Sequence, residues 1–256
     1  MNTLDVSITY DLLKSGFIPM ITWEPWRWPQ RMEGGRRPED QPDFSLAMIL
    51  KGKYDDHIRN WARDLKQISG PIFLRPMHEM NGNWYPWCGR VNGNRPEEYI
   101  KVWRHIRSIF NETGNDRVMW VWSPYAHSVP DESGNEIWRY YPGPKGVDWL
   151  ALDGYNWGET QGWSTWQSFE EVFGKGYDRL AQLSADKPIM LAEVGCAEEG
   201  GDKGKWIEES FGMLGNKFSR IKALVWFNIN KECDWRVESS LKSLKGFRKG
   251  LTNWLS

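Results

Sequence analysis

The chain has 256 residues and a formal net charge of -1, and no basic block is longer than a pair such as Arg36 and Arg37, so it offers nucleic acid no electrostatic footprint. No run of 18 apolar residues is present, which excludes a membrane-spanning helix, and the first ten residues lack the charged start and apolar centre of a signal peptide. Three cysteines without the spacing of zinc ligands give no reason to expect a metal or another cofactor.

Short apolar segments alternate along the chain with segments of helical period, the pattern of repeated strand-helix units in a parallel sheet. A helix is expected over residues 4–16, and two amphipathic helices over 54–68 and 99–110 suit the outer layer of such a sheet. Strands are expected, in chain order, over residues 18–25, 43–50 (the weakest), 71–79, 118–124, 147–156, 187–195 and 223–230.

The fold class that this order predicts is α/β, a (β/α)8 TIM barrel. The length is typical of one such barrel, so we expect one catalytic domain over residues 1–256, and a monomer. The count is short of eight strands, and the chain opens on a helix where a barrel opens on a strand. Either the first strand is missing from this chain, or the opening segment is itself that strand.

Polar residues stand where the predicted strands end, and in a barrel that edge carries the active site. Glu79 and Glu193 are the favoured pair, each close to a glycine, Gly82 or Gly195, that we expect to let the chain turn away. Two carboxyl groups, one protonated and one ionised, are what glycoside hydrolysis needs. An isolated glutamate at a strand end more often caps a loop or pairs with an arginine. Lower-ranked acids are Glu24, Asp148, Asp153, Glu198 and Glu199.

Arg75 stands four residues before Glu79 on the same predicted strand, so it should share its face one layer deeper. There it would favour the ionised form of the carboxylate it approaches, although a purely structural ion pair is an equal alternative. His78 and Glu79 do not form the zinc motif HExxH, because Gly82 occupies the place of its second histidine.

Tryptophan is in excess, with 18 in the chain, and several lie in predicted loops, such as Trp26, Trp157 and Trp163. Most tryptophans of a globular protein belong to its core, but flat aromatic faces in loops also suit the apolar faces of sugar rings. No phosphate-binding or dinucleotide-binding glycine motif is present. The composition therefore favours a carbohydrate ligand.

Five segments, taken in order, resemble glycoside hydrolase family 26, a family of retaining (β/α)8 glycosidases. They are RPMHEMNGNWYPW, VWSP, VDWLALDGYNWG, KPIMLAEVG and VWFNIN, and together they lie within residues 18–230. The resemblance implies that Glu79, at the end of strand 4, is the acid/base and that Glu193, at the end of strand 7, is the nucleophile. It also makes residues 18–25 strand 2, so that strand 1 would precede residue 1.

The same resemblance implies roles in substrate binding. His78 would contact the sugar near the reacting carbon, Tyr155 would hydrogen-bond the nucleophile, and Trp226 would form a platform under the sugar being cleaved. Trp84 matches an aromatic on the leaving-group side. The further residues that we expect to bind substrate are Trp23, Arg75, Asn156 and Trp157.

The mechanism that follows is a double displacement: Glu193 attacks the anomeric carbon while Glu79 protonates the glycosidic oxygen, and Glu79 then activates water. Retention of configuration requires carboxyl groups about 5–5.5 Å apart, and a separation well beyond about 6.5 Å would contradict it.

Within the family, the loops NGNWYPW and DGYNWG favour a mixed-linkage β-1,3-1,4-glucanase (lichenase), with an endo-β-1,4-mannanase as the alternative. Two further hypotheses are open. The chain could be a non-hydrolytic carbohydrate-binding protein on the same barrel, or a poorly folded remnant of an enzyme. The expected partner is a β-glycan polysaccharide, with no nucleic acid and no membrane. An enzyme that degrades a polymer should be exported, although this chain shows no signal peptide.

Overall fold

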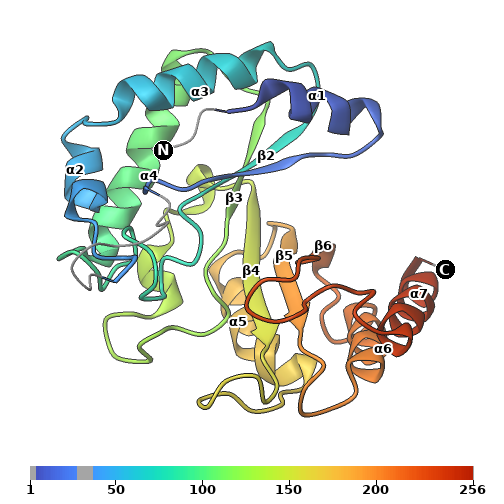
Figure 1. Cartoon of the computed structure of the whole chain (residues 1–256). Coiled ribbons are helices and arrows are strands. Elements are labelled where there is room, and N and C mark those ends of the chain that lie inside the picture. Colours follow the sequence, from blue (N-terminus) through green and yellow to red (C-terminus); the bar gives the residue numbers. More distant parts are fainter. Residues whose placement is uncertain (1–3, 28–36, 256) are drawn as a thin grey trace. The chain divides into compact units, whose positions relative to one another are not determined.

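Helices and parallel strands alternate along residues 4–27 and 37–255, which are those that the computed structural model describes (Figure 1). The chain divides into two units, Met1–Trp149 and Leu150–Ser256. The expectation of one domain over residues 1–256 stays a prediction. None of the described helices has both the length and the apolar character needed to cross a membrane.

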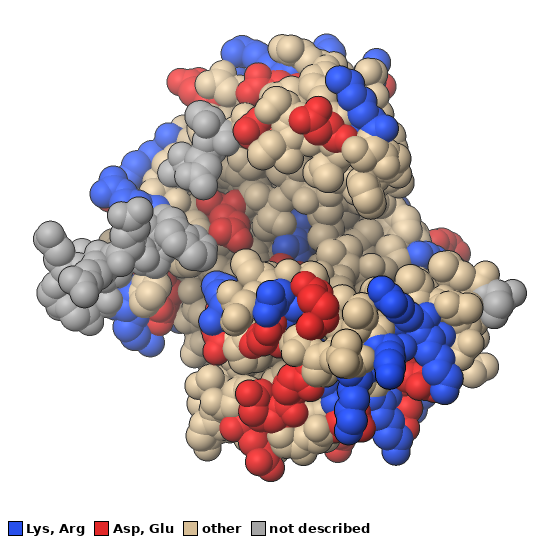
Figure 2. Space-filling view, turned by 45° about the vertical axis from the view of Figure 1, so that its right-hand side comes forward, with Lys and Arg blue, Asp and Glu red and all other residues tan. Residues whose placement is uncertain are grey.

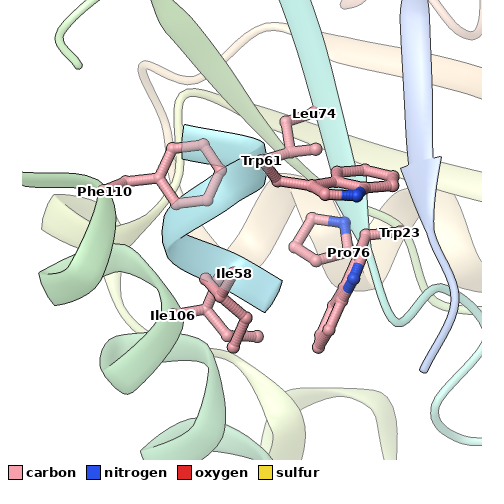
Figure 3. A pocket seen from close by; sticks show the side chains of 7 residues that line it. All are labelled: Trp23, Ile58, Trp61, Leu74, Pro76, Ile106 and Phe110. Carbon is pink, nitrogen blue, oxygen red and sulfur yellow. The ribbon is translucent and has the colours of Figure 1, made fainter. Parts of the chain in front are cut away.

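In the first unit, three parallel strands lie side by side in chain order: β1 (Met20–Trp23), β2 (Ile72–Pro76) and β3 (Val118–Trp122). Helices α3 (Asp55–Gln67) and α4 (Pro96–Glu112) bury their apolar faces against them. Figure 3 shows this layer, with Trp23 and Leu74 from the strands facing Ile58 and Phe110 from the helices. The shorter elements of this unit are α1 (Val6–Lys14), α2 (Leu46–Leu50) and the 3-10 helices η2 (Pro42–Phe44), η3 (Ile137–Tyr140) and η4 (Pro144–Gly146).

The predicted opening helix is confirmed as α1, which begins after Asp5, whose side chain accepts hydrogen bonds from the backbone N–H groups of Ser7 and Ile8. The predicted strand over residues 43–50 is wrong, because that segment forms η2 and α2. Leu46 and Ile49 are both fully buried, and their spacing of three residues places them on one face of a helix. A short apolar run has no period long enough to separate the two states.

The predicted strand numbering also needs correction. Met20 lies opposite Phe73, so β1 pairs directly with β2 and no strand lies between them. If β2 is strand 4 of a barrel, residues 18–25 form strand 3 and not strand 2. The described residues contain six strands in all.

The second unit repeats the pattern with β4 (Trp149–Asn156), β5 (Ile189–Cys196) and β6 (Ile221–Trp226), again parallel and in chain order. Its helices are α5 (Phe169–Leu183), α6 (Lys203–Leu214) and α7 (Leu241–Leu255). Helices α6 and α7 pack on each other through rings such as Phe211 and Phe247, whose centroids are 5.5 Å apart.

Charges of both signs occur on the face drawn in Figure 2. Oppositely charged side chains form pairs on α6 and α7, such as Lys249 Nζ with Glu208 Oε1 at 2.6 Å and Lys205 Nζ with Glu209 Oε1 at 3.5 Å. Such exposed pairs contribute little to stability, but they keep the surface mixed in charge.

Candidate active site

Glu79 lies just beyond the end of β2, in a strained stretch of backbone. Met77 and Glu79 both adopt left-handed conformations, with φ of 50° and 53°, which cost non-glycine residues about 1 kcal/mol or more each. The Glu79 N–H donates to the carbonyl oxygen of Ser123, beyond the end of β3, at 2.8 Å. The side chain is only 5% exposed. Backbone strain of this kind gathers at functional sites, which supports the choice of Glu79.

Trp84 holds the Glu79 carboxylate. Its indole Nε1–H donates to Glu79 Oε2 at 2.6 Å, so the structure brings together two residues that the sequence predicted for one site. The ring of Trp84 passes directly over Gly82, where a Cβ would lie 2.6 Å from it. The chain does turn here, since the Gly82 N–H donates to the Glu79 carbonyl oxygen at 2.9 Å, but the structure also explains the glycine by the close approach of the Trp84 ring.

Asn81, which the sequence analysis did not single out, fixes the loop that carries Glu79. It is fully buried; its amide donates to the carbonyl of Tyr125 and accepts from the N–H of Tyr125, both at 2.9 Å. The Asn135 amide donates in turn to the Asn81 carbonyl at 3.0 Å. The Tyr125 ring meets Trp84 edge to face at 5.1 Å. The loops after β2 and β3 thus form one scaffold around Glu79.

His78 is 2% exposed and lies beside aromatic rings and the carboxylate of Glu24. Its Nε2 is 3.9 Å from Glu24 Oε1, and its ring centroid is 5.0 Å from that of Tyr85. Trp26 donates from Nε1 to Glu24 Oε2 at 3.1 Å and packs edge to face on Tyr85. A buried histidine beside flat rings and a carboxylate suits the hydroxyl groups and apolar faces of a sugar.

Three of the lower-ranked acids, Glu24, Asp148 and Glu198, contact other side chains or the backbone. Glu24 lies beside His78, as above. Asp148 accepts the backbone N–H of Trp120 at 2.8 Å, and Glu198 accepts the hydroxyl of Ser239 at 2.6 Å. Asp148 and Glu198 therefore have structural contacts, in keeping with their lower rank.

Arg75 is 5% exposed on β2, and its Nε donates to Thr22 Oγ1 on β1 at 3.0 Å. Its predicted influence on a carboxylate stays a prediction.

Trp23 needs correction as a predicted substrate-binding residue. Its ring is 4% exposed and lies between the strands and the helices, with Ile58, Trp61 and Ile106 (Figure 3). Successive residues of a strand point to opposite faces. Trp23 points into the helix layer. The next residue, Glu24, therefore points to the other face, where its carboxylate lies near His78.

In the second unit, Glu193 lies on β5, opposite Asp153 of β4. The Tyr155 hydroxyl donates to Glu193 Oε2, which is the contact that the family resemblance implied. Gly195 lies under the rings here: a Cβ on it would be 2.6 Å from Tyr155 and 2.9 Å from Trp235. As at Gly82, the reason for the glycine is the close approach of aromatic side chains.

Trp235 is the residue of this unit that sequence reasoning missed. It is 1% exposed, and its ring lies 5.0 Å from that of Tyr155 and 4.8 Å from that of Trp157, the latter at 88°. Trp157, predicted to bind substrate, therefore does lie beside Tyr155, with their ring centroids 6.2 Å apart. In the sequence, Trp235 was marked only by its position in the loop after the last predicted strand, residues 223–230.

Trp226 is not where its predicted role requires it. Its ring packs against Trp206 of α6 at 6.4 Å and Phe247 of α7 at 6.0 Å. Its Nε1–H donates to the carbonyl oxygen of Trp235 at 2.7 Å. The structure therefore places the Trp226 ring in the helix layer, where it supports Trp235, and does not place it as a platform beside Tyr155.

Asn156, like Trp226, makes structural contacts. It is fully buried, and its Oδ1 accepts the N–H groups of Gly158 at 3.1 Å and Gln167 at 3.0 Å. Its Nδ2 donates to Cys196 Sγ at 3.4 Å. These contacts shape the loop after β4, so the predicted substrate contact of Asn156 is replaced by a structural one.

Replacing Tyr155 with phenylalanine should lower kcat on a glycan substrate by about 10- to 100-fold, because a hydrogen bond to a charged group contributes about 1.5–3 kcal/mol. The measurement is steady-state kinetics together with a thermal melt. Tyr177→Phe is the matched control, since Tyr177 lies in the same unit and its hydroxyl accepts only a long bond, 3.3 Å, from the backbone N–H of Arg220. Equal losses in the two variants would contradict a specific role for the Tyr155 hydroxyl.

Comparison with known proteins identifies the family to which this chain is related. The family model for glycosyl hydrolase family 26 matches residues 40–195. Endoglucanase H of Acetivibrio thermocellus is 41% identical over 242 residues, which are 93% of this chain and 24% of that protein. Mannan endo-1,4-beta-mannosidase of Bacillus subtilis (strain 168) is 30% identical over 211 residues, 76% of this chain and 52% of that protein. The chain thus spans about a quarter and about half of these two relatives.

Among solved structures, the catalytic domain of Bacillus sp. JAMB-750 GH26 endo-beta-1,4-mannanase superposes with a TM-score of 0.73 at 18% identity, over 97% of this chain and 69% of that one. At this identity the likeness speaks for the fold alone. It shows the (β/α)8-barrel class that the order of the predicted elements indicated.

Proposed function

The chain belongs to glycosyl hydrolase family 26, and on this premise we propose that it cleaves a β-glycan backbone internally with retention of configuration. The observation that carries the proposal is that each of the two predicted glutamates has an aromatic donor on its carboxylate: Trp84 on Glu79 and Tyr155 on Glu193. A carbohydrate-binding surface needs the aromatic rings, but it has no need of two carboxylates that are oriented by dedicated donors.

The proposed reaction assigns one task to each carboxyl group. Glu193 attacks the anomeric carbon, and the Tyr155 O–H holds the attacking carboxylate in one orientation. Glu79, oriented by Trp84, protonates the departing glycosidic oxygen and, once ionised, removes a proton from the water that hydrolyses the glycosyl-enzyme. His78 and its surrounding rings bind the sugar.

We propose β-1,4-mannan as the substrate. Support comes from the mannanase names among the relatives, which favour this alternative over the mixed-linkage glucan that the loop motifs predicted. Glucan remains a second candidate on one observation, the 41% identity with a protein named as an endoglucanase. The two sugars differ in the direction of a single hydroxyl group, which a few hydrogen bonds discriminate.

The test is release of reducing ends from galactomannan, barley mixed-linkage glucan and β-1,3-xylan, with viscosity as the measure of internal cleavage and Glu193→Ala as the control. Cleavage of mannan alone supports the proposed substrate. Cleavage of glucan alone would show that mixed-linkage glucan, the second candidate, is the substrate. If a cooperatively melting protein binds these polymers but cleaves none, the binding-protein reading replaces the enzyme. A chain that shows no cooperative melting would be the poorly folded remnant.

Because an intact polysaccharide stays outside the cell, we also propose that the protein acts there. Detection of the activity in the culture medium of the producing cells would support this, and activity found only in the cell lysate would contradict it.

A further inference from the structure

A buried lysine holds the loop beside the nucleophile. Lys203 is the first residue of α6, and it is only 1% exposed. Burial lowers the pKa of its ammonium group, as expected for a cation removed from water. A lysine is seldom buried so completely unless its donors are satisfied. Here they are: Nζ donates to the carbonyl oxygens of Asp234 at 3.0 Å and Arg236 at 2.8 Å, and to Ser239 Oγ at 2.8 Å.

The two carbonyl groups that Lys203 binds lie on either side of Trp235. The carbonyl of Trp235 itself accepts from the Trp226 indole at 2.7 Å, so three consecutive carbonyl groups of this loop are held by side chains. The Trp235 indole donates to Glu232 Oε2 at 3.2 Å. Both the backbone and the ring of Trp235 are therefore fixed in place.

The ring so fixed lies against Tyr155, 5.0 Å away between centroids, and Tyr155 donates to Glu193. Gly195 leaves open the space in which these two rings meet, since a Cβ there would lie within 2.9 Å of both. A continuous series of contacts thus runs from Lys203 through Trp235 and Tyr155 to the carboxylate.

We propose that Lys203 is a positioning residue for the nucleophile: by binding the backbone on both sides of Trp235, it keeps Tyr155 aligned with Glu193. The inference rests on the proposed function, in which Glu193 attacks the sugar. Lys203 does not touch the reacting atoms, and it acts through two aromatic side chains.

The first test compares Lys203→Met, which keeps the length of the side chain but removes its donors, with Lys205→Met two residues along the same helix. Lys205 is the matched control because its side chain is 72% exposed. A displacement of about 1 Å at a reacting group can cost about 100-fold in rate. We therefore expect kcat to fall about 10- to 100-fold in Lys203→Met, with KM changed less than about 3-fold and Lys205→Met unaffected.

The second test asks whether the loss passes through Tyr155. In a Tyr155→Phe background, the further loss caused by Lys203→Met should shrink to less than about 3-fold, because coupled residues are not additive. Trp226→Phe removes the donor to the Trp235 carbonyl and shortens a ring that packs in the helix layer. It should show a smaller loss with the same coupling, and it replaces Lys203→Met if that variant does not fold. An unchanged kcat in the folded variants, or equal losses in both backgrounds, would overturn the inference.

A readout without turnover separates this inference from the proposed function. The ring resonance of Tyr155 in protein with ¹³C-labelled tyrosine can be assigned with Tyr155→Phe. It should shift in Lys203→Met or Trp226→Phe and stay in place in Lys205→Met. If the wild type cleaves no glycan, the proposed function fails and this resonance alone decides whether Lys203 positions Tyr155. A resonance that does not move in a folded variant overturns the inference whether or not the wild type is active.

Discussion

Glu193→Ala is expected to lower kcat by about 10⁴-fold or more, the scale of loss when a covalent nucleophile is removed from an enzyme that depends on it. Substrate binding should persist, because the rings around His78 in the first unit are untouched. The measurements are kcat on the cleaved polysaccharide and the affinity for an oligosaccharide by calorimetry. Glu199→Ala is the matched control, since Glu199 is exposed in the loop that follows the same strand.

Added azide gives this prediction a stereochemical check. In Glu193→Ala, azide can enter the space left by the carboxylate and attack the anomeric carbon of a substrate with an activated leaving group. The product should be the α-glycosyl azide, formed by a single inversion. A β-glycosyl azide, or undiminished turnover without azide, would show that Glu193 is not the nucleophile.

Glu79→Ala is expected to lower kcat/KM on the polysaccharide by about 10²- to 10⁴-fold, the usual contribution of general acid catalysis. On a dinitrophenyl glycoside the formation of the glycosyl-enzyme should be nearly unaffected, because that leaving group departs without a proton. Pre-steady-state release of dinitrophenol measures this step directly. Hydrolysis of the intermediate should then become limiting, since Glu79 no longer activates water.

Glu112→Ala, at the exposed end of α4, is the control for the loss of a carboxylate from the same unit. Azide should rescue Glu79→Ala with the β-glycosyl azide as product, the configuration opposite to that from Glu193→Ala. An equal loss on the polysaccharide and on the activated glycoside would mean that Glu79 does not act as the acid.

Local patterns were enough to predict the alternation of strands and helices. Six of the seven expected strands are present, because runs such as residues 71–79 and 187–195 are apolar, β-rich and bounded by turn residues. The segment 43–50 was assigned wrongly because Leu46 and Ile49 fit a buried strand and a buried helix equally well in so short a run. The pairing of β1 with β2, which sets the strand count, is a contact between distant residues that no local pattern encodes.

The sequence by itself determined the class of the protein and its two candidate carboxylates, because a polar residue at the end of a buried strand is a signal carried by adjacent residues. Only the tertiary structure decided which aromatic side chains lie near these two carboxylates. It placed Trp23 and Trp226 in the helix layers and brought Trp235 to Tyr155. These placements depend on which face of a strand a ring occupies and on how a distant loop returns. Packing between elements far apart in the chain settles both.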